Sequence, residues 1–102
     1  MGEVYVRIDD RLIHGQTIIA WCPTLGIKEI IAVDDVSASN PMLKSIMTMS
    51  VPSAYKTNIV TTEEAGMLLS NESSGNRLLI VKNSKVLKDL EEHVKKAKSI
   101  IL

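Results

Sequence analysis

Cysteine is nearly absent from this 102-residue sequence, and its scarcity limits the covalent and metal chemistry of the chain. Cys22 is the only cysteine, which excludes a disulfide within the chain and a zinc site made of several cysteines, and which fits a reducing compartment. No apolar run is long enough to cross a bilayer, and residues 1–20 lack the pattern of a secretory signal peptide. We therefore expect a cytoplasmic protein.

An excess of charge and a supply of aromatic side chains are also lacking. The 12 basic and 12 acidic residues balance to zero, and aromatic residues make up 3% of the chain. A protein that binds nucleic acid needs a basic surface, often with aromatic residues interleaved, and no stretch of the sequence supplies one. We therefore expect no nucleic-acid partner.

The apolar residues alternate along the chain between the spacing of strands and the spacing of helices. This alternation predicts a three-layer α/β/α fold with a mainly parallel sheet of about five strands, in a single domain over residues 1–102. Residues 34–41 are predicted to form a loop. The helix over 61–70 opens with Thr61 followed by carboxylates, which predicts a capped start, and Ser84 is predicted to cap the last helix. We predict strands over residues 3–8, 28–33, 55–60 and 77–81, with a fifth from residue 99, and helices over 12–22, 42–51, 61–70 and 84–98.

Polar residues follow each predicted strand, at the edge where such sheets bind ligands. The segment DDRLIHG follows the first strand, DDVSASN the second, a pair of threonines the third and KNS the fourth. Asp34 and Asp35, in the second of these segments, either shape a pocket or cap the next helix. The sequence therefore predicts a functional site at the carboxyl ends of the strands.

The segment DDRLIHGQ after the first strand has the composition of a phosphoryl-accepting loop. The neutral imidazole of His14 is a competent nucleophile, and the guanidinium of Arg11 can neutralise phosphate oxygens. Asp9 or Asp10 can hold one ring nitrogen, and Gly15 leaves room for a phosphoryl group close to the backbone. These residues point to His14 as the phosphoryl acceptor and Arg11 as its charge partner.

Two other interpretations of the same segment stay open on the residues alone. His14 could be a structural hydrogen-bonding residue at a helix start, with Asp9 and Asp10 as helix caps. One imidazole and two carboxylates also suit a divalent cation, although no second histidine lies nearby in the sequence. We predict no metal at this site.

The string RIDDRLIHGQ, followed by Trp21, resembles the active-site segment of the IIB component of the mannose/fructose/sorbose family of the bacterial phosphoenolpyruvate-dependent sugar phosphotransferase system. The segments IIAVDD, TTEEA and LLIVKNSK fall in the family's order and spacing, so the resemblance covers essentially the whole chain. It implies that His14 takes a phosphoryl group from a phosphohistidine of a IIA partner. His14 would then pass the group to a sugar carried by the membrane IIC and IID subunits.

The resemblance also implies an activity, a location and a pocket. The activity is that of a protein-N(pi)-phosphohistidine–sugar phosphotransferase without a cofactor, in the cytoplasm and peripherally associated with the membrane subunits. The first strand is expected between the fourth and the fifth, which brings the segment after the fourth strand beside His14. The pocket residues are then Asp10, Gly15, Gln16, Lys82 and Asn83.

Relatives in this family continue beyond the position of Leu102, so we expect a IIB-type phosphoryl-carrier domain that is truncated at its carboxyl end. The fifth strand would then lie at an edge of the sheet, which leads us to expect either self-association into a homo-oligomer or marginal stability.

Two functions of another class compete with the phosphoryl carrier. A signalling receiver domain would need an acceptor aspartate after the third strand, where the sequence has Val60, Thr61 and Thr62. A non-catalytic anion-binding domain of the same fold would retain phosphate without transferring it. Met42, Met47 and Met49 form either an adaptable partner surface or part of the core, and their helical spacing favours the core.

Overall fold

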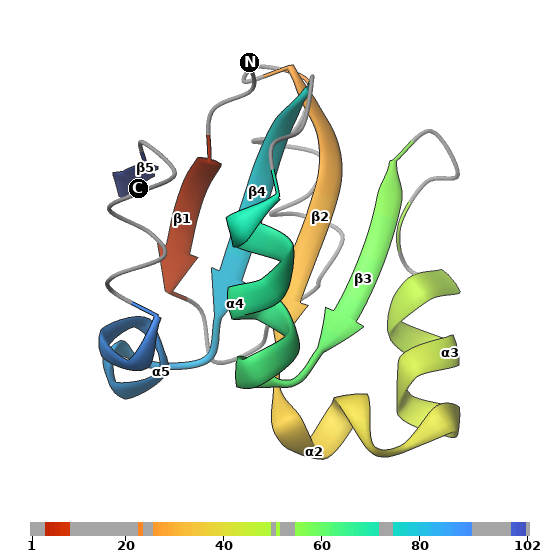
Figure 1. Ribbon diagram of the computed structural model, residues 1–102. Helices are drawn as coiled ribbons and strands as arrows, with labels where there is room; N and C mark the ends of the chain where they lie inside the picture. Colours follow the sequence, from red (N-terminus) through yellow and green to blue (C-terminus); the bar gives the residue numbers. More distant parts are fainter. Residues whose placement is uncertain are drawn as a thin grey trace.

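The described part of the chain is organised by one parallel sheet of five strands, in the order β3-β2-β4-β1-β5 (Figure 1). The computed structural model describes residues 4–8, 23, 26–49, 51, 55–71, 75–90 and 99–101. The predicted α/β fold is confirmed, and β1 lies between β4 and β5 as the resemblance implied. The strands are β1 (Val4–Ile8), β2 (Ile27–Val33), β3 (Lys56–Val60), β4 (Asn76–Val81) and β5 (Ser99–Ile101).

Helices cover both faces of this sheet. The described helices are α2 (Asp35–Ala38), α3 (Pro41–Met49), α4 (Thr62–Ser70) and α5 (Ser84–Asp89). Figure 1 shows α4 in front of the sheet and α3 beside β3. The loop predicted over residues 34–41 was partly wrong, because α2 forms within it, whereas the helix predicted over 12–22 lies outside the described residues.

The core is formed from alternate residues of the strands, which face the two sides of the sheet in turn. On the side of α4 and α5, Val6, Ile31 and Leu79 belong to one buried cluster, and on the other side Ile30 and Leu78 belong to a second. All five residues from position 77 to 81 of β4 are buried. Strands covered on both faces need this near-continuous apolar composition, which is why β2 and β4 could be recognised in the sequence.

The methionines of α3 depart from the prediction that they fill the core. Met47 is partly buried and packs against the second cluster, as predicted. Met42 and Met49 are 73% and 81% exposed, so the prediction was wrong for both. Helical spacing identifies residues on one face of a helix but does not show whether that face is buried. In this fold α3 lies beside β3, the last strand in the described sheet order, so the sheet covers only part of the helix surface (Figure 1).

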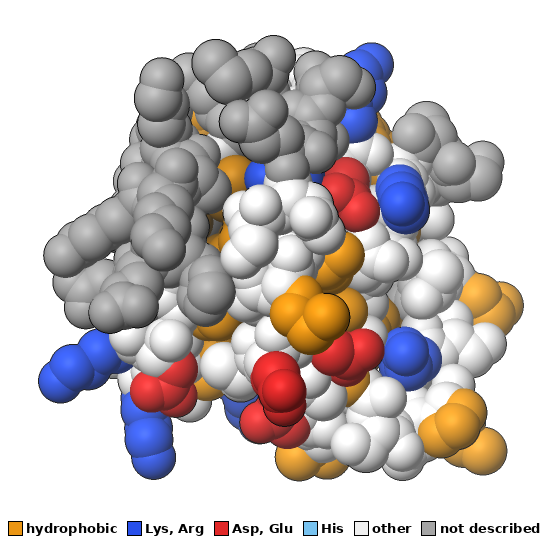
Figure 2. Space-filling view, in the orientation of Figure 1, with side chains coloured by type: hydrophobic (Ala, Val, Ile, Leu, Met, Phe, Trp, Pro, Cys, Tyr) orange, Lys and Arg blue, Asp and Glu red, His pale blue; other side chains and the backbone are white. Residues whose placement is uncertain are grey.

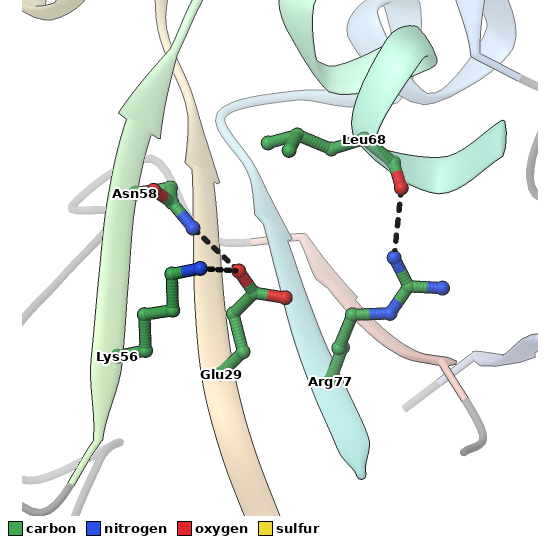
Figure 3. A network of polar contacts seen from close by, with 5 residues as sticks. All are labelled: Glu29, Lys56, Asn58, Leu68 and Arg77. Carbon is green, nitrogen blue, oxygen red and sulfur yellow. Dashed lines mark hydrogen bonds and ion pairs between the residues drawn. The ribbon is translucent and has the colours of Figure 1, made fainter. Parts of the chain in front are cut away.

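A polar network stabilises the amino ends of the strands (Figure 3). Arg77, at the start of β4, is 5% exposed and donates from Nη1 to the carbonyl oxygen of Leu68 at 2.9 Å. This carbonyl belongs to the last turn of α4, where a cation is favourable. Beside it, Glu29 accepts a hydrogen bond from Asn58 at 2.6 Å and pairs with Lys56 at 3.9 Å. The network lies at the end of the sheet opposite the predicted site.

A capping box begins α4 at the carboxyl end of β3, as the sequence predicted. The hydroxyl of Thr61 accepts from the backbone N–H of Glu64, and the carboxylate of Glu64 accepts from the backbone N–H of Thr61, both at 3.1 Å. The pKa of the Glu64 carboxyl is lowered first by the hydrogen bond from the Thr61 backbone and then by the Thr61 side chain. Desolvation opposes this shift, and the positive charge of Lys44 adds to it. Glu64 therefore holds the start of α4 in its ionised form.

The cap of α5 differs from the prediction by one residue. The backbone of Asn83 is extended, and its side-chain oxygen accepts from the backbone N–H of Val86 at 3.0 Å. Ser84 is already the first residue of the helix, so the prediction of Ser84 as the cap was wrong. Both side chains favour a cap, and the sequence alone did not indicate which of the two neighbours is extended.

We predict that the stabilisation contributed by the Glu64 charge depends on pH. Because the pKa is lowered on folding, this contribution is present above the ordinary value of 4.5 and is lost as the pH falls through the lowered pKa of the folded chain. The parent should be more stable than Glu64→Gln near pH 7, and the two should converge in acid. Urea unfolding of both proteins over this pH range measures the difference.

Glu63→Gln is the matched control, since it removes a carboxylate from the same helical turn outside the Thr61 pair. A difference between the parent and Glu64→Gln that stays constant from neutral to acid pH would contradict the prediction.

Candidate functional site

The carboxyl ends of β1 and β4 lie side by side at the predicted site. The two strands are parallel, and their last residues, Ile8 and Val81, are partners in the register. The chain continues from β1 toward β2 and from β4 toward β5, which are opposite directions across the sheet. Ligands bind at such reversals in open α/β sheets, because the connections leave the edge on different sides. This edge is therefore the best-supported site in the fold.

Lys82 and Asn83 are the predicted pocket residues that the structure describes. Both are exposed, and they follow β4 directly, at the level where the segment DDRLIHGQ follows β1. The side-chain oxygen of Asn83 caps α5 through Val86, so its amide nitrogen is the group suited to donate to an anion. Lys82 adds a flexible positive charge to the same position.

The other predicted site residues fall in a segment that is not described. His14, Arg11, Asp10, Gly15 and Gln16 lie outside the described residues. What the structure shows is the register of β1 from which this segment starts and the residues of β4 that flank it.

Two acidic residues at the end of β2 have structural roles at this edge. Asp34 caps α2, accepting from the N–H of Val36 at 3.3 Å and from the hydroxyl of Ser37 at 2.6 Å. Asp35 accepts from the backbone N–H of Thr62 at 2.7 Å, which joins α2 to the start of α4. Capping the next helix was one of the two roles predicted for this pair, but that helix was predicted over 42–51. Asp34 instead caps α2, which forms inside the segment predicted as a loop.

The contact between Asp35 and Thr62 was missed in the sequence because the two residues are 27 positions apart. The signal that could have found it is that each follows one of two neighbouring parallel strands, with Val33 and Val60 as partners. The carboxylate of Asp35 lies at the amino end of α4, where anions are favourable. The chain thus supplies its own anion at that helix start.

A cleft between α4 and α5 hollows the described surface away from the predicted site. It has a volume of about 320 Å³, and its lining includes Glu63, Met67 and Asp89. Acidic side chains gather over the first turn of α4 in Figure 2. Carboxylates repel a phosphoryl group, so this cleft is unsuited to the predicted chemistry.

Within the described ranges, no group of three or more His, Cys, Asp and Glu side chains is placed to hold a metal ion. No helix in the described part of the chain is long and apolar enough to cross a membrane.

Comparison with known proteins finds IIB components of phosphotransferase systems. A probable phosphotransferase enzyme IIB component of Streptococcus pyogenes serotype M6 is 29% identical over 80 residues, which are 78% of this chain and 49% of that protein. The sorbose-specific EIIB component of Klebsiella pneumoniae is 32% identical over 71 residues, 70% of this chain and 43% of that protein. The chain therefore spans about half the length of the curated relatives it matches.

Solved structures agree with this result. The manxB protein of Thermoanaerobacter tengcongensis has a TM-score of 0.77 at 31% identity, over 89% of this chain and 56% of that one. The IIBSor domain of the Klebsiella pneumoniae sorbose permease shares the fold, with a TM-score of 0.80 at 24% identity over 91% of this chain and 58% of that one.

The family model described as "PTS system sorbose subfamily IIB component" matches residues 3–102. It thereby spans the described strands and helices, the pairing of β1 with β4, and the DDRLIHGQ segment. The chain therefore belongs to the sorbose subfamily of phosphotransferase-system IIB components.

Proposed function

We propose that residues 1–102 form a phosphoryl-carrier domain in which His14 accepts a phosphoryl group from a phosphohistidine of a IIA partner. His14 then transfers the group to a sugar taken up through membrane IIC and IID subunits, at the cytoplasmic face of the membrane. Membership of the IIB family supports this function. The structural observation that carries it is the pairing of Ile8 with Val81, because it aligns the starts of the segments that hold His14 and Lys82.

The proposed reaction is an in-line displacement at phosphorus. A ring nitrogen of neutral His14 forms the new N–P bond while the N–P bond of the donor histidine breaks. In the second step the sugar hydroxyl oxygen forms the new O–P bond while the N–P bond at His14 breaks. The hydroxyl proton ends on the released imidazole, which returns to its neutral form. No metal or cofactor takes part in either step.

The surrounding residues neutralise charge and position the ring. Arg11 and Lys82 neutralise the phosphoryl oxygens, whose charge must be stabilised throughout the transfer. Asp10 holds the non-reacting ring nitrogen, and Gly15 lets the phosphoryl group approach the backbone. The side-chain amides of Gln16 and Asn83 donate hydrogen bonds to the same oxygens.

The first prediction concerns the acceptor itself. The protein should gain one acid-labile phosphoryl group when it is incubated with phosphoenolpyruvate, the two general phosphotransferase proteins and a IIA protein of the family. His14→Ala should gain none, because it lacks the nucleophile, and intact-mass measurement distinguishes the two. A phosphorylated His14→Ala protein would remove His14 from the mechanism. Phosphate that binds the parent without a covalent mass gain would favour the non-catalytic anion-binding domain.

The second prediction concerns Lys82. Lys82→Met keeps the length of the side chain and removes its charge, so phosphorylation of His14 should slow roughly tenfold or more, the effect of losing one charge-assisted hydrogen bond. Rapid-quench measurement of the rate of mass gain tests this. Lys28→Met is the matched control. Lys28 is also exposed, but it lies at the amino end of β2, whereas the proposed site lies at the carboxyl ends of the strands. Equal rates for the two variants would exclude Lys82 from the site.

A further inference from the structure

The helix α3 exposes a continuous apolar stripe. None of its nine residues is buried, and Met42, Ile46 and Met49 are 73%, 56% and 81% exposed. Their spacing of four and three positions places them on one side of the helix. We call these three residues the α3 patch. Single exposed apolar side chains are ordinary, but several on one face of a short helix mark an interaction surface.

The α3 patch starts close to the edge of the sheet that holds the proposed site. The backbone N–H of Asp34, just after β2, donates to the carbonyl oxygen of Val60 at 3.0 Å, and α2 and α3 follow from there. The side of the molecule where α3 lies shows hydrophobic side chains in Figure 2, and α2 lies at the carboxyl edge in Figure 1. A protein bound to the patch would therefore also reach the carboxyl ends of the strands.

The size of the patch argues against a stable dimer of this chain through α3. A stable interface takes about 20–30 residues on each side. The helices α2 and α3 hold four and nine residues. A surface of this size suits a partner that binds and leaves, and methionine side chains adapt to such a partner because they are flexible.

The charges beside the patch argue against a lipid surface. A helix that lies on a membrane carries several Lys or Arg residues on its polar face, whereas α2 and α3 together hold one, Lys44. Asp34 and Asp35 precede the patch, and anionic headgroups would repel them. These observations favour a soluble protein over a membrane or a subunit embedded in one.

We infer that the α3 patch is the docking surface for the soluble phosphodonor protein, a transient partner with an apolar contact surface beside its phosphohistidine. The inference rests on the proposed function, since it names the partner that the site uses. Docking lowers the KM for the donor, and the chemistry at His14 does not require it.

The test separates docking from chemistry. Met42→Gln/Met49→Gln keeps side-chain length and helix propensity but removes the apolar contact. Its KM for the phosphorylated IIA donor should rise roughly tenfold with kcat little changed. Phosphoramidate, a small donor that phosphorylates imidazole and releases ammonia, should react with the variant as fast as with the parent. Met67→Gln is the matched control, because Met67 is 66% exposed on α4, outside the patch.

Each other outcome overturns the inference in a recognisable way. An unchanged KM for the donor, with the parent active, would show that the donor docks elsewhere. A parent that sediments as a dimer and a double variant that sediments as a monomer would assign the patch to a second copy of the chain. A loss confined to sugar phosphorylation with membranes would assign it to the membrane subunits. A parent that reacts with neither donor would overturn the proposed function as well.

Discussion

The parallel pairing of β4 with β1 on one side and β2 on the other is the constraint on which the rest of the structure depends. Because β4 is buried on both faces, its apolar residues must contact a helix layer on each side of the sheet. The register of this pairing brings Ile8 and Val81 to the same level, and the segments that follow them must then leave the sheet together. The location of the proposed site thus follows from the pairing and register of the central strand.

At the carboxyl edge of the sheet, the ends of β1 and β4 are better suited to an anion than the described helix starts are. Side chains of the chain itself occupy the starts of the described helices that follow β2, β3 and β4: Asp34 caps α2, Thr61 and Asp35 bind the start of α4, and Asn83 caps α5. These contacts satisfy donors that would otherwise attract a phosphate. Carboxylates around α2 and α4 add negative charge, whereas Lys82 adds positive charge beside β1. Electrostatics and topology therefore favour the same place.

Much of the fold could be predicted from the sequence, and the exceptions have physical reasons. Buried parallel strands such as β2 and β4 need long apolar runs, and Thr61 with Glu64 is a local signal, so these predictions were confirmed. The choice between Asn83 and Ser84 as a cap depends on backbone angles that the residue types do not determine. The bond between Asp35 and Thr62 depends on two strands being neighbours in the sheet. Of the proposed site, His14 and Arg11 remain predictions of the sequence and the family.

The exposure of α3 follows from the place of β3 in the sheet. A helix over the centre of a sheet can bury a wide apolar face, as Ala65 and Leu69 of α4 do against the strands. In the described part of the chain, β3 pairs only with β2, so the helix beside it has sheet on one side and solvent on the other. Only Met47 of the three α3 methionines is partly buried. Exposed apolar side chains at that position add little to the stability of the fold. Burying them against another protein would still remove apolar surface from water, which is favourable. The proposed carrier has to release its partner, and an interface of that limited size suits this requirement, because each additional buried apolar group slows dissociation.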